Sequence, residues 1–321
     1  MRNETVRPIV TKTARDQDTG RRPSLFYGSA REGMRDFLAH TLASPDDGVL
    51  LPAFIGLSPR EGSGVLDPVL SVGAQAGFYN LNPDLTVDVD DLERRLSTDS
   101  YRVVVIIHYY GRTEPRLAAI RTLADATGAL VVEDLAHGFF TALSGGTAGR
   151  HGHLNLFSLH KMFPFDDGGM VQYATTDLLR GQAQTRPELA QRILDYDWAT
   201  IARARRENFL VLSERLAALP ECGRDFDFLW EHLGDDDVPQ TLPVRILSDR
   251  RDAIYAGMNA DGYGMVSLYH TLIEQVRGRF EVLEELSRHI INFPVHQDVR
   301  VADVDGMLES FRRHLAMGDQ S

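Results

Sequence analysis

Residues 129–137 read Ala-Leu-Val-Val-Glu-Asp-Leu-Ala-His, a short apolar run that ends in charged residues. Residues 102–108 (RVVVIIH) have the same character, and such runs are typical of strands buried on both faces of a parallel sheet. Residues 115–127, between the two, begin with a proline and end before Gly128, which are start and stop signals of a helix. This spacing of strand, helix and strand predicts a right-handed crossover in a mainly parallel sheet.

Other short segments extend this pattern along the first half of the chain. We expect further strands at 49–54, 77–81, 154–157 and 170–173, and helices at 30–42 and 87–96. The alternation predicts an α/β fold in which helices flank a mainly parallel sheet.

The pattern changes after residue 173. We expect one long charged helix over 187–219 and a linker over 221–240, followed by short strands that alternate with helices. The predicted organisation is an N-terminal arm (1–24), a large domain (25–222) and a smaller C-terminal α+β domain (223–321).

Composition excludes several classes of protein. The chain has 321 residues, and 34 basic against 46 acidic residues give a formal net charge of −12, which repels nucleic acid and anionic lipid. The single cysteine, Cys222, allows neither an intramolecular disulfide nor a multi-cysteine metal site. No stretch approaches the roughly 20 apolar residues of a membrane span. We therefore expect a cytoplasmic protein that binds neither nucleic acid nor membrane.

Two residues at neighbouring strand ends carry the main chemical signal. Asp134 follows one buried strand and Lys161 follows the next, and ligands bind at the carboxyl ends of such strands. Lysine occurs at only one other position, Lys12. Taken singly, Asp134 is more simply interpreted as a loop carboxylate and Lys161 as a surface amine. Together they supply what pyridoxal phosphate (PLP) needs, a lysine for the Schiff base and a carboxylate that keeps the ring nitrogen protonated.

A third segment, Gly28-Ser-Ala-Arg-Glu, suits the phosphate of the same cofactor. Ser29 precedes a predicted helix whose first amides belong to Ala30 and Arg31, and free amides at a helix start bind anions. A simple N-cap role for Ser29 explains the same residues.

Six segments in this order resemble the DegT–StrS family of fold-type I PLP-dependent enzymes: VLLPAF (49–54), IIHYYG (106–111), VVEDLAH (131–137), FSLHKMFPFDDGGM (157–170), RRENF (205–209) and INFPVHQDV (291–299). The resemblance implies a homodimeric PLP-dependent aminotransferase of fold type I. Its small-molecule partners would be an amino acid donor and a keto acceptor, sugar-derived or from natural-product biosynthesis.

The resemblance also implies roles for single residues. Lys161 would bind the cofactor covalently and then move a proton, and Asp134 would pair with the ring nitrogen. His137 stands where the family usually has a glutamine near the phenolic oxygen of the cofactor. The other implied cofactor contacts are Phe54 against the ring, and Ala30, Arg31 and Ser158 at the phosphate.

Other polar residues carry weaker signals. His108, Tyr109 and Tyr110 end a buried strand and are either substrate contacts or core residues. His296, at a later strand end, is either structural or close to the substrate. A metal site is not expected, because the histidines at 151 and 153 have no third ligand at metal spacing.

Three departures from the family pattern leave the reaction open. Ser158 precedes Lys161 by three positions instead of five, which matches a compact subset of relatives. The Gly-Tyr-Asn-x-Arg-Met loop that helps to shape the substrate pocket in typical sugar aminotransferases is missing, so the sequence does not identify the acceptor. Histidine at position 137 keeps a PLP-dependent lyase, dehydratase or cyclase as an alternative, and a non-catalytic relative is the second alternative.

Overall fold

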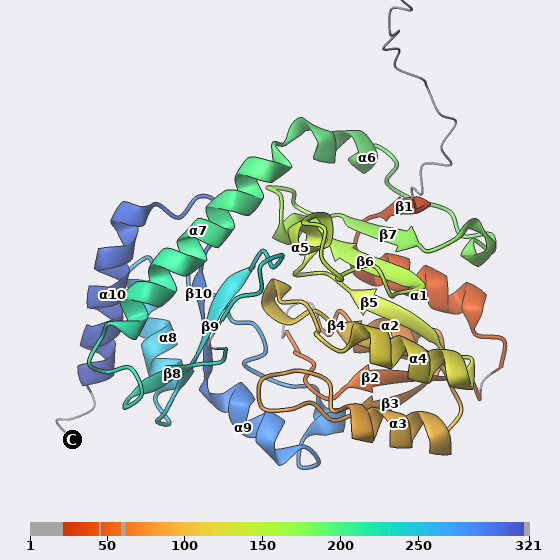
Figure 1. Ribbon diagram of the computed structural model, residues 1–321, viewed down its shortest axis with the longest axis horizontal. Helices are drawn as coiled ribbons and strands as arrows, with labels where there is room; N and C mark the ends of the chain where they lie inside the picture. The colour runs from red at the N-terminus through yellow and green to blue at the C-terminus, as the bar shows by residue number, and fades with distance from the viewer. Residues whose placement is uncertain (1–21, 45, 59–61, 231, 318–321) are drawn as a thin grey trace, which may run out of the picture.

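A seven-stranded sheet organises the larger part of the molecule (Figure 1). The computed structural model describes residues 22–44, 46–58, 62–230 and 232–317, so almost all of the predicted arm (1–24) lies outside the described residues. The strand order is β1-β7-β6-β5-β4-β2-β3. The strands are β1 (Ser24–Tyr27), β2 (Gly48–Pro52), β3 (Gln75–Tyr79), β4 (Tyr101–Ile107), β5 (Leu130–Asp134), β6 (Leu154–Ser158) and β7 (Gly169–Tyr173).

Five of these strands are parallel, as the buried apolar runs predict. Strands β3, β2, β4, β5 and β6 run in one direction, and β7 is antiparallel to both β6 and β1. Helices cover both faces, with α1 packed on α2 and α3 packed on α4 (Figure 1). Their bounds are α1 (Ala30–Thr41), α2 (Leu66–Ser71), α3 (Val89–Thr98), α4 (Leu117–Thr127) and the short α5 (Phe139–Leu143).

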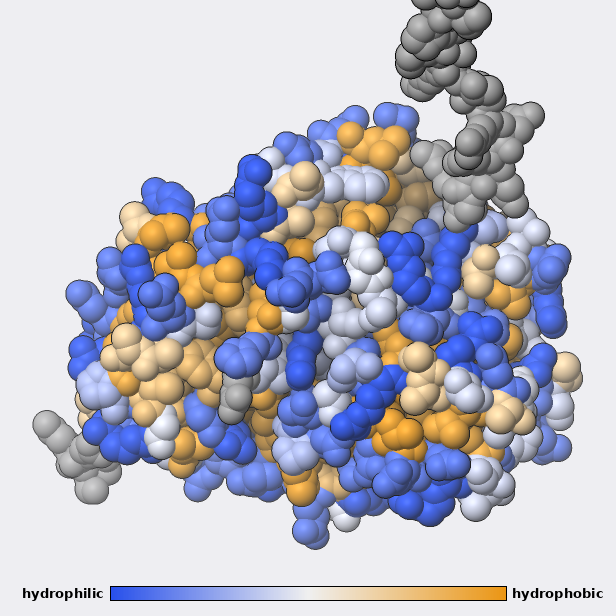
Figure 2. Space-filling view, in the orientation of Figure 1, coloured by the Kyte–Doolittle hydropathy of each residue, from blue (hydrophilic) through white to orange (hydrophobic). Residues whose placement is uncertain are grey.

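A three-stranded antiparallel sheet organises the C-terminal part, in the order β10-β9-β8. Its strands are β8 (Phe226–Phe228), β9 (Thr241–Ile246) and β10 (Ile290–Pro294), and its helices are α8 (Arg251–Ala260), α9 (Glu281–His289) and α10 (Val301–Ala316). The long helix α7 (Trp198–Ala217) lies along this part in Figure 1 and contributes Phe209, Leu212 and Leu216 to its core. Hydrophilic residues predominate on the face shown in Figure 2, and they separate its hydrophobic patches.

Two predicted segments differ from the structure. The single helix expected over 187–219 is wrong: α6 (Leu189–Arg192) and a 3-10 turn precede α7. The break occurs because the Asp197 side chain accepts from the Thr200 N–H and so starts a new helix. The linker expected over 221–240 is wrong in part, because it contains β8, whose Phe226 is fully buried. Short elements such as β1, α2 and α5 carry too few residues to show a period.

The topology brings distant segments to one edge of the large sheet. Parallel pairing sets Ile107 beside Asp134, and Asp134 beside Leu156, so β4, β5 and β6 end together. Strand β1 ends at the same edge because two successive antiparallel pairings restore its direction. The start of α1, directly after β1, therefore lies next to the ends of β5 and β6. Among the described residues no helix combines the length and the apolarity that crossing a membrane requires.

Gly169 allows the start of α1 to approach the sheet. A Cβ at this position would overlap the backbone of Ser29 and Ala30, well inside van der Waals contact. Because backbone atoms cannot rotate away, we expect Gly169→Ala to lower the free energy of unfolding by about 1–3 kcal/mol. Urea unfolding followed by circular dichroism measures the change. Gly64→Ala is the matched control, since a Cβ there would meet nothing within 4 Å; equal stability of the two variants would contradict the packing argument.

Candidate active site

Asp134 ends β5 as a buried carboxylate with 8% of its surface exposed. Its Oδ1 accepts a hydrogen bond from the Ala136 N–H at 2.9 Å. Burial raises the pKa of Asp134 above its ordinary value, although the hydrogen bond from the Ala136 N–H opposes this shift. The carboxylate is therefore poorly solvated, and a cation held against it would be stabilised.

Lys161 and His137 meet beside this carboxylate. Lys161 ends a 3-10 turn (Leu159–Lys161) that directly follows β6, and its Nζ lies 3.1 Å from His137 Nε2. His137 follows β5 in a turn closed by a hydrogen bond from Gly138 N–H to Leu135 O at 2.9 Å. Burial lowers the pKa of His137 well below its ordinary value. The imidazole is therefore neutral near neutral pH.

A cavity of about 760 Å³ contains these groups. Of the residues predicted for the site, the structure places Arg31, Asp134, His137 and Lys161 in its wall. The rest of the wall comes from the loop after β2 and from the segment before α9: Ile55, Gly56, Leu57, Ser58, Gly62, Ser63, Gly64 and Val65, and Val266, Ser267, Leu268, Tyr269, His270 and Thr271, with Ile107, Ala136 and Tyr255.

The start of α1 faces the same region and carries the features of an anion site. Ser29 is the N-cap, and its Oγ accepts from the Glu32 N–H at 3.1 Å. Helix geometry leaves the earlier amides, those of Ala30 and Arg31, without partners inside the helix. Ser158, also predicted for the phosphate, is buried at the end of β6, with its Oγ 3.3 Å from Nδ1 of His160. The N-cap interpretation and the anion-site interpretation of Ser29 are thus compatible.

Three predicted contact residues lie behind the cavity wall instead of in it. Phe54 is fully buried, and its ring centroid lies 5.0 Å from that of Tyr269. The Tyr109 hydroxyl donates to the Phe54 carbonyl at 2.7 Å. Tyr110 donates its backbone N–H to His137 Nδ1 at 3.3 Å. Phe54, Tyr109 and Tyr110 therefore support the lining residues from outside.

Two predicted histidines are not brought to the cavity. His108 is fully buried, and its Nε2 lies 2.9 Å from Glu133 Oε2. Glu133 also accepts the N–H groups of Gly149 and His151, at 2.6 and 2.8 Å, and that of Gly152. His296 lies in the loop after β10, 3.5 Å from Asp298, with 45% of its side chain exposed.

Sequence reasoning missed the segment that covers the site. Residues 269–273 pair with the loop after β2, through a hydrogen bond from Leu57 N–H to Thr271 O at 2.8 Å and one from Ile273 N–H to Ile55 O at 3.0 Å. Tyr269, in this segment, has a left-handed backbone (φ 59°) and lines the cavity. Neither helical nor strand periodicity marks these residues in the sequence, so no local signal identifies them.

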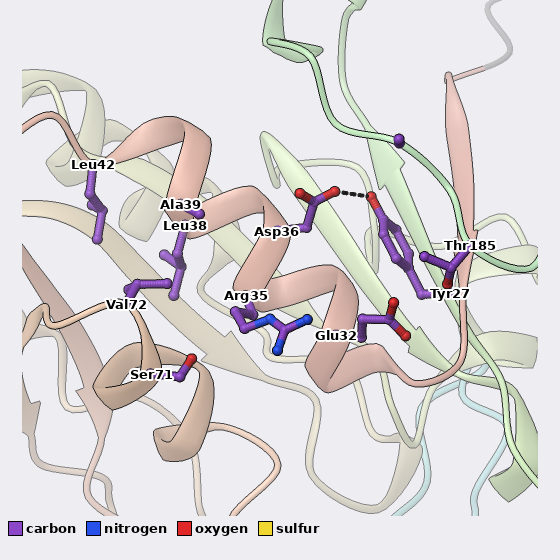
Figure 3. A pocket seen from close by; sticks show the side chains of 11 residues that line it. Tyr27, Glu32, Arg35, Asp36, Leu38, Ala39, Leu42, Ser71, Val72 and Thr185 are labelled. Atoms are coloured by element: carbon purple, nitrogen blue, oxygen red, sulfur yellow. Dashed lines mark hydrogen bonds between the residues drawn. The ribbon is translucent and has the colours of Figure 1, made fainter.

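A second hollow, of about 550 Å³, lies on the exposed side of α1. Figure 3 shows Glu32, Arg35 and Asp36 along it, with the Tyr27 hydroxyl donating to Asp36 at 2.6 Å. A smaller hollow between the two contains Arg31 of the main cavity together with Glu32 and Arg35 of the second. The site thus continues onto a polar surface formed by α1.

Comparison with known proteins supports the resemblance that the motifs indicated. Residues 37–182 match the model of the DegT/DnrJ/EryC1/StrS aminotransferase family, so the resemblance is confirmed over this part of the chain. A curated relative, GDP-perosamine synthase of Vibrio cholerae, is 27% identical over 128 residues. That match spans 39% of this chain and only a third (33%) of the relative.

Solved structures extend the likeness to most of the fold. The S. venezuelae protein DesV, solved in complex with a ketimine intermediate, has a TM-score of 0.72 at 18% identity, covering 91% of this chain and 85% of its own. Helicobacter pylori PseC, an aminotransferase involved in the biosynthesis of pseudoaminic acid, has a TM-score of 0.74 at 15% identity, covering 92% and 87%. NtdA of Bacillus subtilis, solved with bound cofactor PMP, has a TM-score of 0.71 at 16% identity. The match covers 92% of this chain and 74% of NtdA. At such identities the likeness concerns the fold, and the fold-type I architecture is confirmed.

Glu133 and the groups bound to its carboxylate, from His108, Gly149, His151 and Gly152, form a buried Glu133 network. This network predicts an effect on protein stability that is separate from the proposed reaction. Burial opposes ionisation of Glu133, but the hydrogen bonds from His108, Gly149 and Gly152 outweigh it, so its pKa lies below the ordinary value. A lowered pKa stabilises the fold above the ordinary glutamate pKa of about 4.3, and this stabilisation is lost as pH falls through the folded-state value. We expect Glu133→Gln to cost about 3 kcal/mol near neutral pH, because an amide cannot accept all these bonds.

Chemical unfolding at a series of pH values tests this expectation. The difference between Glu133→Gln and the wild type should shrink below about pH 4. Glu285→Gln, at a carboxylate on the surface of α9 that is 58% exposed, should leave the unfolding midpoint unchanged. A Glu133→Gln variant as stable as the wild type would contradict the assigned hydrogen bonds.

Proposed function

We propose that this chain, which matches the DegT/DnrJ/EryC1/StrS aminotransferase family over residues 37–182, is a PLP-dependent aminotransferase. It would move an amino group from an amino acid donor to a keto acceptor. The observation that carries this proposal is the meeting of three groups in one cavity: a lysine amine 3.1 Å from a neutral imidazole, beside a buried carboxylate.

The residues present fit PLP. Asp134 is buried, and the raised pKa of this carboxyl calls for a cation, which a protonated pyridine nitrogen provides. Lys161 offers the amine that an aldehyde requires, and the amides at the start of α1 suit a phosphate. When bound, the cofactor supplies a ring that accepts electrons from the substrate carbon.

The side chains of this chain would divide the remaining work. Lys161 would hold the cofactor, and its amine would move the proton of the substrate carbon that carries the transferred amino group. Asp134 fixes the ring by its charge and keeps the ring nitrogen protonated. His137 orients the amine of Lys161. The covering segment around Tyr269 limits the access of water to the cavity.

The acceptor is proposed from the names of the relatives. GDP-perosamine synthase and PseC are named for reactions in sugar biosynthesis, so we propose a keto group on a sugar or natural-product intermediate. The cavity wall adds the hydroxyl-bearing side chains of Ser63, Ser267, Thr271 and Tyr255, which suit a hydroxylated substrate.

We also propose a homodimer in which a second copy covers the outer face of α1. The polar hollow of Figure 3 adjoins the site through Arg31, and Leu70 on the neighbouring helix α2 is 51% exposed. For the chain itself we propose the predicted division into a large domain (25–222) and a small one (223–321), with the C-terminal half of α7, near the end of the large domain, packed into the core of the small one.

Replacement of Lys161 tests the function. The purified protein with PLP should absorb at about 420 nm. Borohydride reduction should attach the cofactor permanently to Lys161, and mass spectrometry of the digested protein should identify this residue as the modified one. Lys161→Ala should abolish both signals, whereas Lys12→Ala, at the only other lysine, should retain them. Glutamate should convert the cofactor to its amine form and release 2-oxoglutarate.

The same measurement separates the alternatives. Bound PLP that no common amino donor converts would favour a lyase, dehydratase or cyclase. Failure of the wild-type protein to bind the cofactor would contradict the proposal and favour a non-catalytic relative.

The homodimer is tested by light scattering. We expect a mass twice that of the 35.9 kDa chain for the wild type and a shift to monomer for Leu70→Asp, because a charge in an apolar contact is poorly tolerated. Leu210→Asp, at a similarly exposed leucine on α7 (49%), should remain dimeric. A monomeric wild type, or two variants that behave alike, would contradict the proposed surface.

A further inference from the structure

We infer that His137 is held in the neutral tautomer with its proton on Nε2, and that it donates this N–H to Nζ of Lys161, so that the lysine is kept as the free amine. Tyr110 and Tyr269 act as positioning residues in this arrangement. Only the use of the free amine, attack on the PLP aldehyde, rests on the proposed function. The position of the proton follows from hydrogen bonds within the chain.

The direction of the first hydrogen bond fixes the tautomer. The Tyr110 backbone N–H lies 3.3 Å from His137 Nδ1, and a backbone N–H can only donate. Nδ1 must therefore present its lone pair. A neutral imidazole carries one ring proton, so that proton is on Nε2.

The doubly protonated form of His137 is disfavoured for two independent reasons. A proton on Nδ1 would face the Tyr110 N–H, donor against donor. Burial also lowers the pKa of His137 well below its ordinary value. The ring therefore stays neutral across the pH range in which the protein would work.

Two strained tyrosines keep the ring in place. Among the described residues only Leu85, Tyr110 and Tyr269 have a positive φ without being glycine. Both tyrosines pack on His137, with ring centroids 6.2 Å away for Tyr110 and 5.9 Å for Tyr269. Left-handed backbone costs free energy for such side chains and gathers at functional sites. Here it turns both rings toward a single imidazole and prevents the ring from rotating away from Lys161.

Hydrogen bonds of His108 also fix the start of the 3-10 turn Tyr109–Gly111, which contains Tyr110. The Gly111 N–H donates to the His108 carbonyl at 3.2 Å, and the His108 side chain is held by Glu133 at 2.9 Å. The buried Glu133 network thus positions the backbone N–H that selects the tautomer. This assigns a role to two buried polar residues that the proposed chemistry does not use directly.

The second hydrogen bond then sets the state of the lysine. With Nε2 as donor at 3.1 Å, Nζ must accept with its lone pair, because an ammonium would oppose one N–H with another. The Asp134 carboxylate favours the ammonium through its charge, whereas the His137 N–H is in direct contact with Nζ at 3.1 Å. The hydroxyls of Tyr110 and Tyr269 add no charge, because burial raises their pKa well above the ordinary value. The free amine is the form that attacks an aldehyde.

Glutamine, the usual residue at this position in the family that the motifs resemble, would also offer a donor. A glutamine amide always offers an N–H, whereas an imidazole offers one at Nε2 in only one neutral tautomer. The Tyr110 N–H selects that tautomer, so the histidine provides the same donor.

Nitrogen NMR of histidine-labelled protein without cofactor tests the tautomer directly. We expect the His137 signals of a protonated Nε2 and an unprotonated Nδ1, unchanged from about one pH unit below to one above neutrality. The spectrum of His137→Gln identifies these signals by their loss. A proton on Nδ1, or titration near the ordinary histidine pKa of about 6.5, would overturn the inference.

The rate of covalent PLP attachment, trapped with borohydride, tests the consequence for Lys161. Near neutral pH we expect His137→Leu to react about tenfold more slowly than the wild type and His137→Gln to recover most of the rate, since its amide also donates. The deficit of His137→Leu should vanish near pH 10, where lysine loses its proton unaided. Equal rates for His137→Leu and the wild type near neutral pH would overturn the role of the donor. If the predicted tautomer is found but the wild-type protein never binds PLP, the inference stands and the proposed function fails.

Discussion

The burial of a carboxylate at the end of β5 is the constraint on which the site depends. Asp134 keeps only 8% of its surface exposed and accepts a hydrogen bond from the Ala136 N–H, which compensates its charge only in part. Leaving a charge in this state costs stability unless a cation is supplied. In the proposed enzyme, the protonated ring of the cofactor would provide that cation. The fold therefore accepts a local cost where a ligand is to bind, as functional sites commonly do.

Two adjacent carboxylates of β5 show how the strand separates structure from chemistry. Successive side chains of a strand point to opposite faces, so Glu133 and Asp134 have different surroundings. Glu133 meets His108 and the N–H groups of Gly149 and His151, and its pKa is lowered. Asp134 faces the cavity, and its pKa is raised. The pKa values of these two neighbouring acidic residues thus shift in opposite directions. The shifts mark Glu133 as a structural residue and Asp134 as a residue of the candidate site.

The sequence predicted the parts of the fold whose signals are local. Buried apolar runs identify β4 and β5, and Gly128 ends α4 with a left-handed backbone (φ 75°), as expected of a C-terminal cap. The long helix was misjudged because the break at Asp197 depends on one side-chain hydrogen bond, which leaves the apolar pattern intact. The strand β8 was missed because its three residues are defined by pairing with β9, a contact that is distant in sequence.

The candidate site divides in the same way. Asp134, His137 and Lys161 were predictable because strand ends in one crossover pattern must meet at one edge. His108 was ambiguous, since the sequence does not say on which face of the sheet a residue after a strand will lie, and it proved to belong to the Glu133 network.

The wall of the cavity opposite the lysine comes from residues 55–58, 62–65 and 266–271, which pair only in the folded chain. The three groups proposed for the chemistry thus come from a single crossover, whereas the surface that would meet an acceptor is assembled from segments about 200 positions apart and without periodicity. In the proposed enzyme, short motifs would therefore encode the chemistry, and acceptor preference would depend on tertiary structure. For the same reason, changes in these two segments of the proposed enzyme would alter acceptor preference without moving Lys161 or Asp134.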